Sequence, residues 1–204
     1  MGVKLLILSW WTPQYLIRKE LENISDKTTS TLKTLIHEQA KEETEVTDSR
    51  AQHSTSIQEQ RAIMAQTHVK MVETLENALG YENAVKLGRE ALFLVGQEVG
   101  RQSREALGVA DNPKDLNRAA KILYRVLGIQ FHLEWLDNSN ARAIIDHCAL
   151  AEHYSQLTCE VLSATDEGVI NGLLPDVTMK FKEYMTSGCK KCKADIHFNE
   201  KRKV

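Results

Sequence analysis

What the sequence lacks excludes several classes of protein. Its 26 Lys and Arg are balanced by 28 Asp and Glu, a net charge of -2, so no general positive field attracts nucleic acid. The apolar start, MGVKLLILSWW, is well under the ~20 residues that span a bilayer. There is no phosphate-binding loop, dinucleotide fingerprint or serine nucleophile elbow. We therefore expect no nucleic-acid partner and no membrane span.

The apolar start resembles the front of a signal peptide, but TPQYLIRKE follows it without a small-x-small cleavage site. We expect this segment to pack on the domain or on a partner, and the protein to be cytoplasmic. In a reducing compartment, four cysteines are thiols or metal ligands rather than disulfides. The exposed-looking LLILSWW and the polar arm that follows it suggest a homodimer.

The length suits one domain with an appendage. Residues 20–60 are rich in charges and hydroxyls, and their sparse Leu and Ile recur at roughly helical spacing. This pattern predicts a loosely packed amphipathic helix, a polar connection near 44–55, and an arm able to swap onto a partner subunit. The chain is accordingly divided into residues 1–55, an apolar segment and helical arm, and residues 56–204, an α+β cysteine-containing domain.

Three firmer helices follow the arm. Two have apolar residues along one face and end at Gly80 and Gly108, and a third begins at the N-capping Asn112 with Pro113. Gly88, Gly96 and Gly100 lie inside the second, where each costs roughly 1 kcal/mol relative to alanine. Close approach of another backbone explains these three glycines best, with ligand access as the alternative.

The period then changes from helix to strand. Apolar residues alternate in GIQFHLEWLD, and ARAIIDHC reads as its antiparallel partner. A helical stretch follows, with an expected break near Thr165 to Gly168, and DVTMKFKEYMT with CKADIHF forms a second hairpin. The predicted fold class is α+β, with several N-terminal helices packed on a small, mostly antiparallel sheet built from two hairpins.

The four cysteines, Cys148, Cys159, Cys189 and Cys192, all lie in the last third of the chain, three of them at changes of predicted structure. If the two hairpins share one sheet, the four sulfurs can meet. A thiolate cluster suits tetrahedral zinc and, on ligand type, equally suits an iron-sulfur cluster. Two alternatives stay open: a redox dithiol at the C-x-x-C pair, and buried inert thiols.

Ionisable neighbours extend the candidate site. His153, five residues after Cys148, is a candidate fourth ligand or general base, and Glu160, beside Cys159, a candidate for acid-base work. Asp146 is a weaker candidate. The lysines around the C-x-x-C pair either offset thiolate charge or form a solvated hairpin tip.

The C-terminal two thirds, roughly residues 70–198, resembles the L-2-amino-thiazoline-4-carboxylic acid hydrolase-like family. The resemblance lies in Cys148, the Cys159-Glu160 pair, the segment 171–175, the hairpin from Gly188 to Cys192, and LGYENAVKLGREALFLVGQEVG upstream. The layout is also distantly similar to the vinyl-reductase-like hydrocarbon-binding domains, which bind small ligands. The family name implies hydrolysis of a cyclic thiazoline C–N or C–S bond.

Cys189 departs from the family pattern and separates two hypotheses. In the first, all four cysteines hold zinc or an iron-sulfur cluster in a sensor or small-ligand-binding protein. In the second, Cys148, Cys159 and Cys192 bind zinc in a hydrolase of a small cyclic amidine or amide, with water as nucleophile and His153 or Glu160 as base. A cysteine nucleophile paired with His153 is a variant of the second.

Overall fold

The computed structural model describes residues 3–40 and 56–199, and the predicted polar connection near 44–55 lies outside them. The described part contains six α-helices, four strands and one 3-10 turn, η1 (Met185–Ser187). The helices are α1 (Val3–Trp10), α2 (Gln14–Ala40), α3 (Ile57–Leu79), α4 (Tyr81–Leu107), α5 (Pro113–Leu127) and α6 (Gln156–Leu173).

The four strands form one antiparallel sheet in the order β1-β2-β4-β3. The strands are β1 (Ile129–Trp135), β2 (Asn140–Cys148), β3 (Val177–Glu183) and β4 (Cys192–Phe198). The two predicted hairpins are both present and share this sheet through the pairing of β2 with β4. The predicted α+β class is confirmed.

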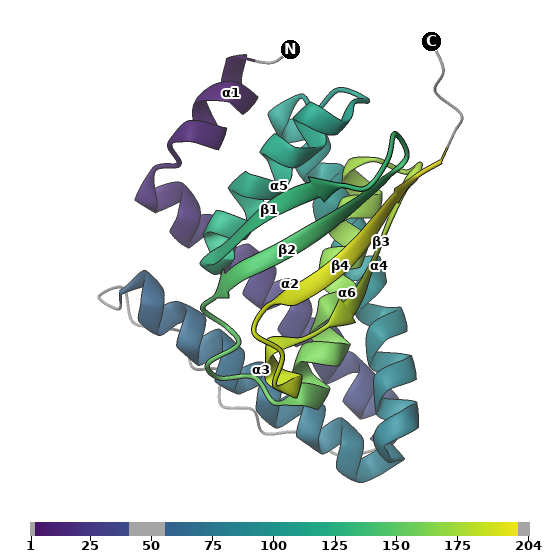
Figure 1. The fold of residues 1–204 in the computed structure, drawn as a ribbon. Coiled ribbons are helices and arrows are strands. Elements are labelled where there is room, and N and C mark those ends of the chain that lie inside the picture. Colours follow the sequence, from purple (N-terminus) through teal and green to yellow (C-terminus); the bar gives the residue numbers. More distant parts are fainter. Residues whose placement is uncertain (1–2, 41–55, 200–204) are drawn as a thin grey trace.

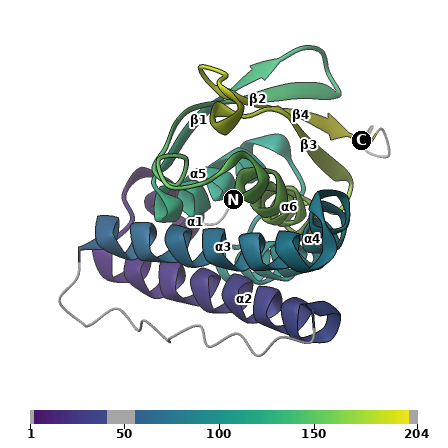
Figure 2. The ribbon, with the colours of Figure 1, turned by 90° about the horizontal axis from the view of Figure 1, so that it is seen from below.

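The helices cover only one face of the sheet (Figure 1). Seen from below, α5 and α6 lie directly under the strands, and α2 and α3 form a layer beyond them (Figure 2). The small side chains of Ala141, Ala143 and Ala194 point into the core under the sheet, where they let the helices approach closely. Period-two alternation places polar residues on the opposite face.

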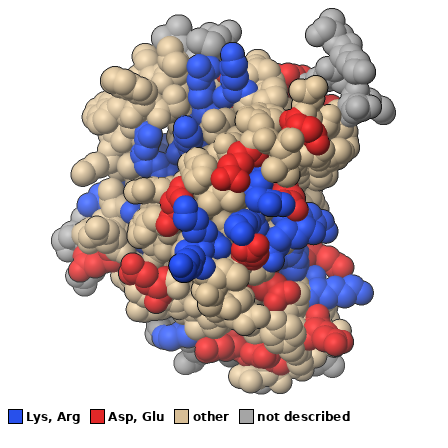
Figure 3. Space-filling view, in the orientation of Figure 1, with Lys and Arg blue, Asp and Glu red and all other residues tan. Residues whose placement is uncertain are grey.

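That opposite face carries interleaved charges of both signs (Figure 3). Lys191 pairs with Asp146 at 2.6 Å, and Lys193 pairs with Glu183 at 2.9 Å. Lys191 and Lys193 therefore pair with carboxylates on the outer surface of the sheet.

Helices α4 and α6 pack with their backbones almost touching, which is the role predicted for the glycines of α4. A Cβ added at Gly96 would lie 2.1 Å from the carbonyl oxygen of Thr165, and one at Gly100 would lie 2.3 Å from that of Val169. A Cβ added at Gly168 of α6 would likewise lie 2.1 Å from the carbonyl oxygen of Phe93. The predicted break near Thr165 to Gly168 is wrong, because this glycine serves helix packing inside a continuous α6.

The prediction of a loosely packed arm is also wrong. Leu21, Leu32 and Ile36 of α2 are at most 2% exposed. Apart from the exposed Tyr15, the apolar residues of α2 lie mainly on one face, and α3 and α4 cover that face. A helix with few apolar residues is thus well packed because nearly all of them lie on the face that contacts the other helices.

The apolar start packs on the same chain, as predicted, but only in part. Leu5 of α1 is fully buried against α5, whereas Trp10 and Trp11 are 92% and 67% exposed. Lys4 holds the helix by donating to the carbonyl of Ala106 at 2.7 Å. None of the described helices has the length and apolar character to cross a bilayer.

Candidate functional site: an apolar cavity with three thiols

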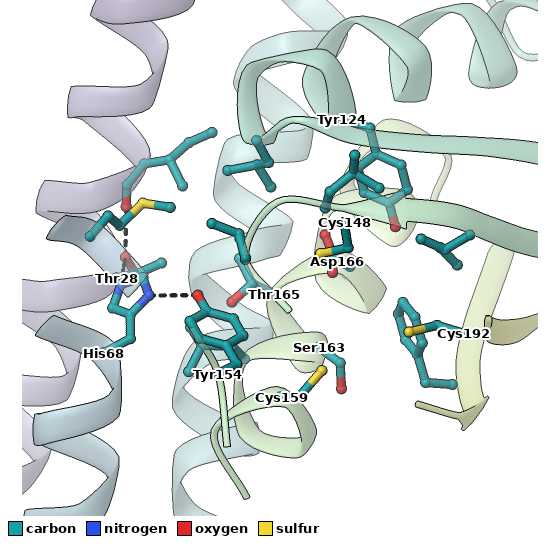
Figure 4. A pocket seen from close by; sticks show the side chains of 18 residues that line it. Thr28, His68, Tyr124, Cys148, Tyr154, Cys159, Ser163, Thr165, Asp166 and Cys192 are labelled. Atoms are coloured by element: carbon teal, nitrogen blue, oxygen red, sulfur yellow. Dashed lines mark hydrogen bonds between the residues drawn. The ribbon is translucent and has the colours of Figure 1, made fainter. Parts of the chain in front are cut away.

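A cavity lies between the α2–α3 layer on one side and α5, α6 and the sheet on the other (Figure 4). The space that no atom fills, including its opening, is about 680 Å³. Its wall is almost entirely apolar, formed by aliphatic and aromatic side chains of both layers. The few polar groups that reach it therefore define its chemistry.

Three of the four cysteines line this cavity: Cys148 at the end of β2, Cys159 on α6 and Cys192 at the start of β4. Burial raises the pKa of Cys148 to about 11 and that of Cys159 to about 12, and it also raises the pKa of Cys192. The backbone N–H of Met185 donates to Cys192 Sγ at 3.2 Å. At neutral pH the cavity thus presents neutral thiols, which behave as small apolar groups.

The fourth cysteine, Cys189, does not line the cavity and lies in the loop between η1 and β4. Within residues 3–40 and 56–199, no three His, Cys, Asp or Glu side chains are grouped so that they could hold a metal ion. The donor set predicted from the sequence is therefore not assembled, and zinc and iron-sulfur binding remain predictions without geometric support.

The two predicted catalytic residues lie elsewhere. His153 is exposed in the turn after β2, and Glu160 points toward the start of α4, where Tyr81 O–H donates to it at 2.6 Å. Neither residue lines the cavity. Asp146 binds His132 and Lys191 on the outer face of the sheet. The roles proposed for His153 and Glu160 thus remain untested predictions, for residues that the fold places away from the cavity thiols.

The sequence reasoning missed Asp166, the one carboxyl in the cavity. Its neighbour Glu167 is paired with Arg89 at 2.8 Å and accepts from the N–H of Phe181. Asp166 has no hydrogen bond or ion pair among the residues described. Burial, and then the charge of Glu167, raise its pKa to about 7. The only signal was an Asp-Glu pair in an otherwise apolar helix, which reads equally well as a solvated pair.

A buried chain of hydrogen bonds crosses the opposite wall. Thr28 Oγ1 donates its single proton to the carbonyls of Ile24 and Ser25, at 2.8 and 3.1 Å. It must then accept from His68 Nε2, 2.8 Å away. His68 Nδ1 is left as an acceptor for Tyr154 O–H, also at 2.8 Å. Burial lowers the pKa of His68 to about 4, so this ring is neutral.

The arrangement predicts unequal thiol reactivity. At pH 8 we expect Cys189 to react first with a disulfide reagent, and Cys148 and Cys159 to react roughly 100-fold more slowly, because thiolate is the nucleophile and burial suppresses it. Mass spectrometry of labelled peptides at timed intervals gives each rate. Equal protection of all four thiols, lifted by a chelator, would instead indicate the metal site predicted from the sequence.

Two solved structures share this fold. One is a trafficking protein particle complex subunit 3 from Naegleria fowleri covalently bound to palmitic acid, with TM-score 0.55 and 14% identity, over 69% of this chain and 95% of that one. The other is the phenol-responsive sensory domain of the transcription activator PoxR with phenol, with TM-score 0.52 and 13% identity, over 70% and 76%. At these identities the likeness concerns the fold alone.

Sequence comparison gives one further finding. The family model described as L-2-amino-thiazoline-4-carboxylic acid hydrolase matches residues 60–196, which include every helix from α4 onward, the strands β1 to β3 and most of β4. Comparison with the curated proteins gives no match.

Proposed function

The chain belongs to the L-2-amino-thiazoline-4-carboxylic acid hydrolase family, and we propose that it is a small-molecule-binding protein whose ligand occupies the cavity between α3, α6 and the sheet. The single observation that carries this proposal is the apolar cavity between these layers, which holds one unpartnered carboxyl, Asp166. Small-molecule sites are typically concave and mostly apolar, with a few placed polar groups.

The two structures with this fold support the proposal by what they hold. One carries palmitic acid and the other phenol, both largely apolar molecules. The cavity of this chain offers the same kind of environment, in which an apolar molecule gains free energy by leaving water. The homodimer, the cytoplasmic location and the boundary near residue 55 remain predictions from the sequence.

The state of the thiols favours binding over nucleophilic catalysis. A cysteine nucleophile needs a lowered pKa or an adjacent base, and the pKa of Cys148 and Cys159 is raised instead. The one histidine that lines the cavity, His68, already uses both ring nitrogens, on Thr28 and Tyr154. It is therefore not available to take a thiol proton.

Calorimetric titration with phenol tests the proposed function. We expect the wild type to bind phenol and Cys159→Trp to bind it about tenfold or more weakly, because an indole at this position fills the cavity. Cys189→Trp is the matched control, since it adds the same ring outside the cavity. Equal binding by all three proteins would place the phenol elsewhere and contradict the proposal.

A hydrolase of a small cyclic amidine or amide is the second candidate, and Asp166 is the observation that favours it. A carboxyl whose pKa is about 7 has the proton affinity of an efficient general base near neutral pH. Incubation with L-2-amino-thiazoline-4-carboxylate tests this role. Consumption of the compound by the wild type but not by Asp166→Asn would establish the hydrolase, whereas we expect neither protein to consume it.

A further inference from the structure

We propose that the cavity selects an apolar amine, whose protonated nitrogen binds Asp166, and rejects carboxylates, including the compound that gives the family its name. This inference rests on the proposed function, because it specifies the ligand of the same cavity. It is carried by the place of Asp166 in the cavity, by the absence of a cation among the lining residues, and by the direction of the hydrogen bonds from Tyr154 to Thr28.

The first step is the charge inside the cavity. No lysine or arginine is among its lining residues, and Asp166 is its one carboxyl. The guanidinium of Arg89, which reaches α6 from α4, is already held by Glu167, Ser163 and the carbonyl of Glu160. A carboxylate entering the cavity would therefore find no cation and would meet the charge of Asp166, whereas an ammonium group would find a partner.

The second step is the direction of the buried hydrogen-bond chain. Since Thr28 gives its proton to α2 carbonyls, His68 donates to Thr28 and Tyr154 donates to His68. The proton of Tyr154 is committed, and only the lone pairs of its oxygen remain for a ligand. Two of the polar groups on opposite walls, Tyr154 and ionised Asp166, are thus hydrogen-bond acceptors, and they require a donor from the ligand.

The third step is the wall between these acceptors. Aromatic rings of Tyr124, Tyr154 and Phe181 line the cavity beside Asp166, and Figure 4 shows Asp166 between Tyr124 and Tyr154. The faces of such rings attract a desolvated cation. The three cavity thiols add only weakly polar surface. A compact apolar body with one amine thus matches Asp166, Tyr154 and the three rings.

Three probes of one scaffold test the inference by calorimetry at pH 8: 2-phenylethylamine, 2-phenylethanol and phenylacetate. For the wild type we expect the amine to bind most tightly and phenylacetate at least about 30-fold more weakly, because its charge is unpaired. In Asp166→Asn, affinity for the amine should fall about tenfold or more, with the alcohol changing much less. Asp26→Asn, the same substitution on the exposed face of α2, should leave all three affinities unchanged.

The outcomes separate this inference from the proposed function. If phenylacetate binds the wild type as tightly as the amine, or if Asp166→Asn leaves the affinity for the amine unchanged, the cavity binds ligands but the inference is wrong. If none of the three probes binds and phenol also fails, the proposed function is wrong as well. Circular dichroism of each variant before titration confirms that a lost affinity is not a lost fold.

Discussion

Gly96→Ala is expected to lower the free energy of unfolding by about 3 kcal/mol, because one added methyl forces two packed helices apart. The new Cβ would lie 2.1 Å from the carbonyl oxygen of Thr165 and 2.9 Å from the N of Val169, both backbone atoms that cannot rotate away. The helix-propensity gain of alanine, about 1 kcal/mol, opposes this loss without cancelling it. Urea unfolding measures the difference in the free energy of unfolding, provided that its dependence on urea concentration is the same in both proteins.

The controls for this prediction lie on both helices. Glu90→Ala, at an exposed position of α4, should change stability by less than about 0.5 kcal/mol. Gly168→Ala meets the carbonyl of Phe93 from the other side and should match Gly96→Ala. The variant with both substitutions should lose less unfolding free energy than the two single variants lose together, because one displacement of the helices relieves both contacts. Wild-type stability in Gly96→Ala would show that α4 and α6 do not touch.

Asp166→Asn is expected to stabilise the protein at alkaline pH and to leave it nearly unchanged at pH 4. The pKa of Asp166 is raised from 3.8 to about 7 in the native state. The unfolded chain therefore loses this proton first, and native stability falls as pH rises from about 4 to 7 and then levels off. A tenfold change in proton affinity corresponds to about 1.4 kcal/mol, so ionisation costs the native state on the order of 4 kcal/mol by pH 8.

The pH-dependent difference in the free energy of unfolding between Asp166→Asn and the wild type can be assigned to Asp166, because most of the groups around it do not titrate in this range. The side chains whose charge couples to that of Asp166 belong to α5, β2, α6, β4 and the turn before α6: Tyr124, Cys148, Tyr154, Cys159, Glu167 and Cys192. Burial raises the pKa of both tyrosines well above 10, that of Cys148 to about 11 and that of Cys159 to about 12, so these groups stay neutral between pH 4 and 8. Denaturant unfolding at pH 4, 6 and 8 gives the free energy of unfolding of the variant and of the wild type, and the difference between the two is compared across the three pH values. A difference independent of pH would contradict the assignment.

The sequence predicted most of the fold because its signals are local. Alternating apolar residues in 129–135 identify a strand, Asn112 and Pro113 begin α5, and the glycines inside α4 announce a close contact. It did not predict that α6 is continuous. A glycine at position 168 would weaken an isolated helix, but here it leaves room for the backbone of α4. The local sequence does not show that α4 approaches so closely.

The candidate site was predicted only in part, for a geometric reason. Cys148 and Cys192 lie at strand ends, as the alternation implies, and Cys159 faces the same cavity from α6. The angle of α6 under the sheet decides whether these sulfurs form a cluster or only line the same cavity. That angle is set by the packing of α6 on α4. Asp166 was missed because its place beside Glu167 does not reveal which carboxyl faces Arg89 and which faces the cavity.

The most direct test of the cavity as the ligand site is a crystal structure of the protein grown with 2-phenylethylamine. We predict electron density for the amine inside the cavity, its ring among Tyr124, Tyr154 and Phe181 and its nitrogen within about 3 Å of a carboxylate oxygen of Asp166. An empty cavity, in crystals of protein that calorimetry shows to be saturated with the amine, would contradict the account.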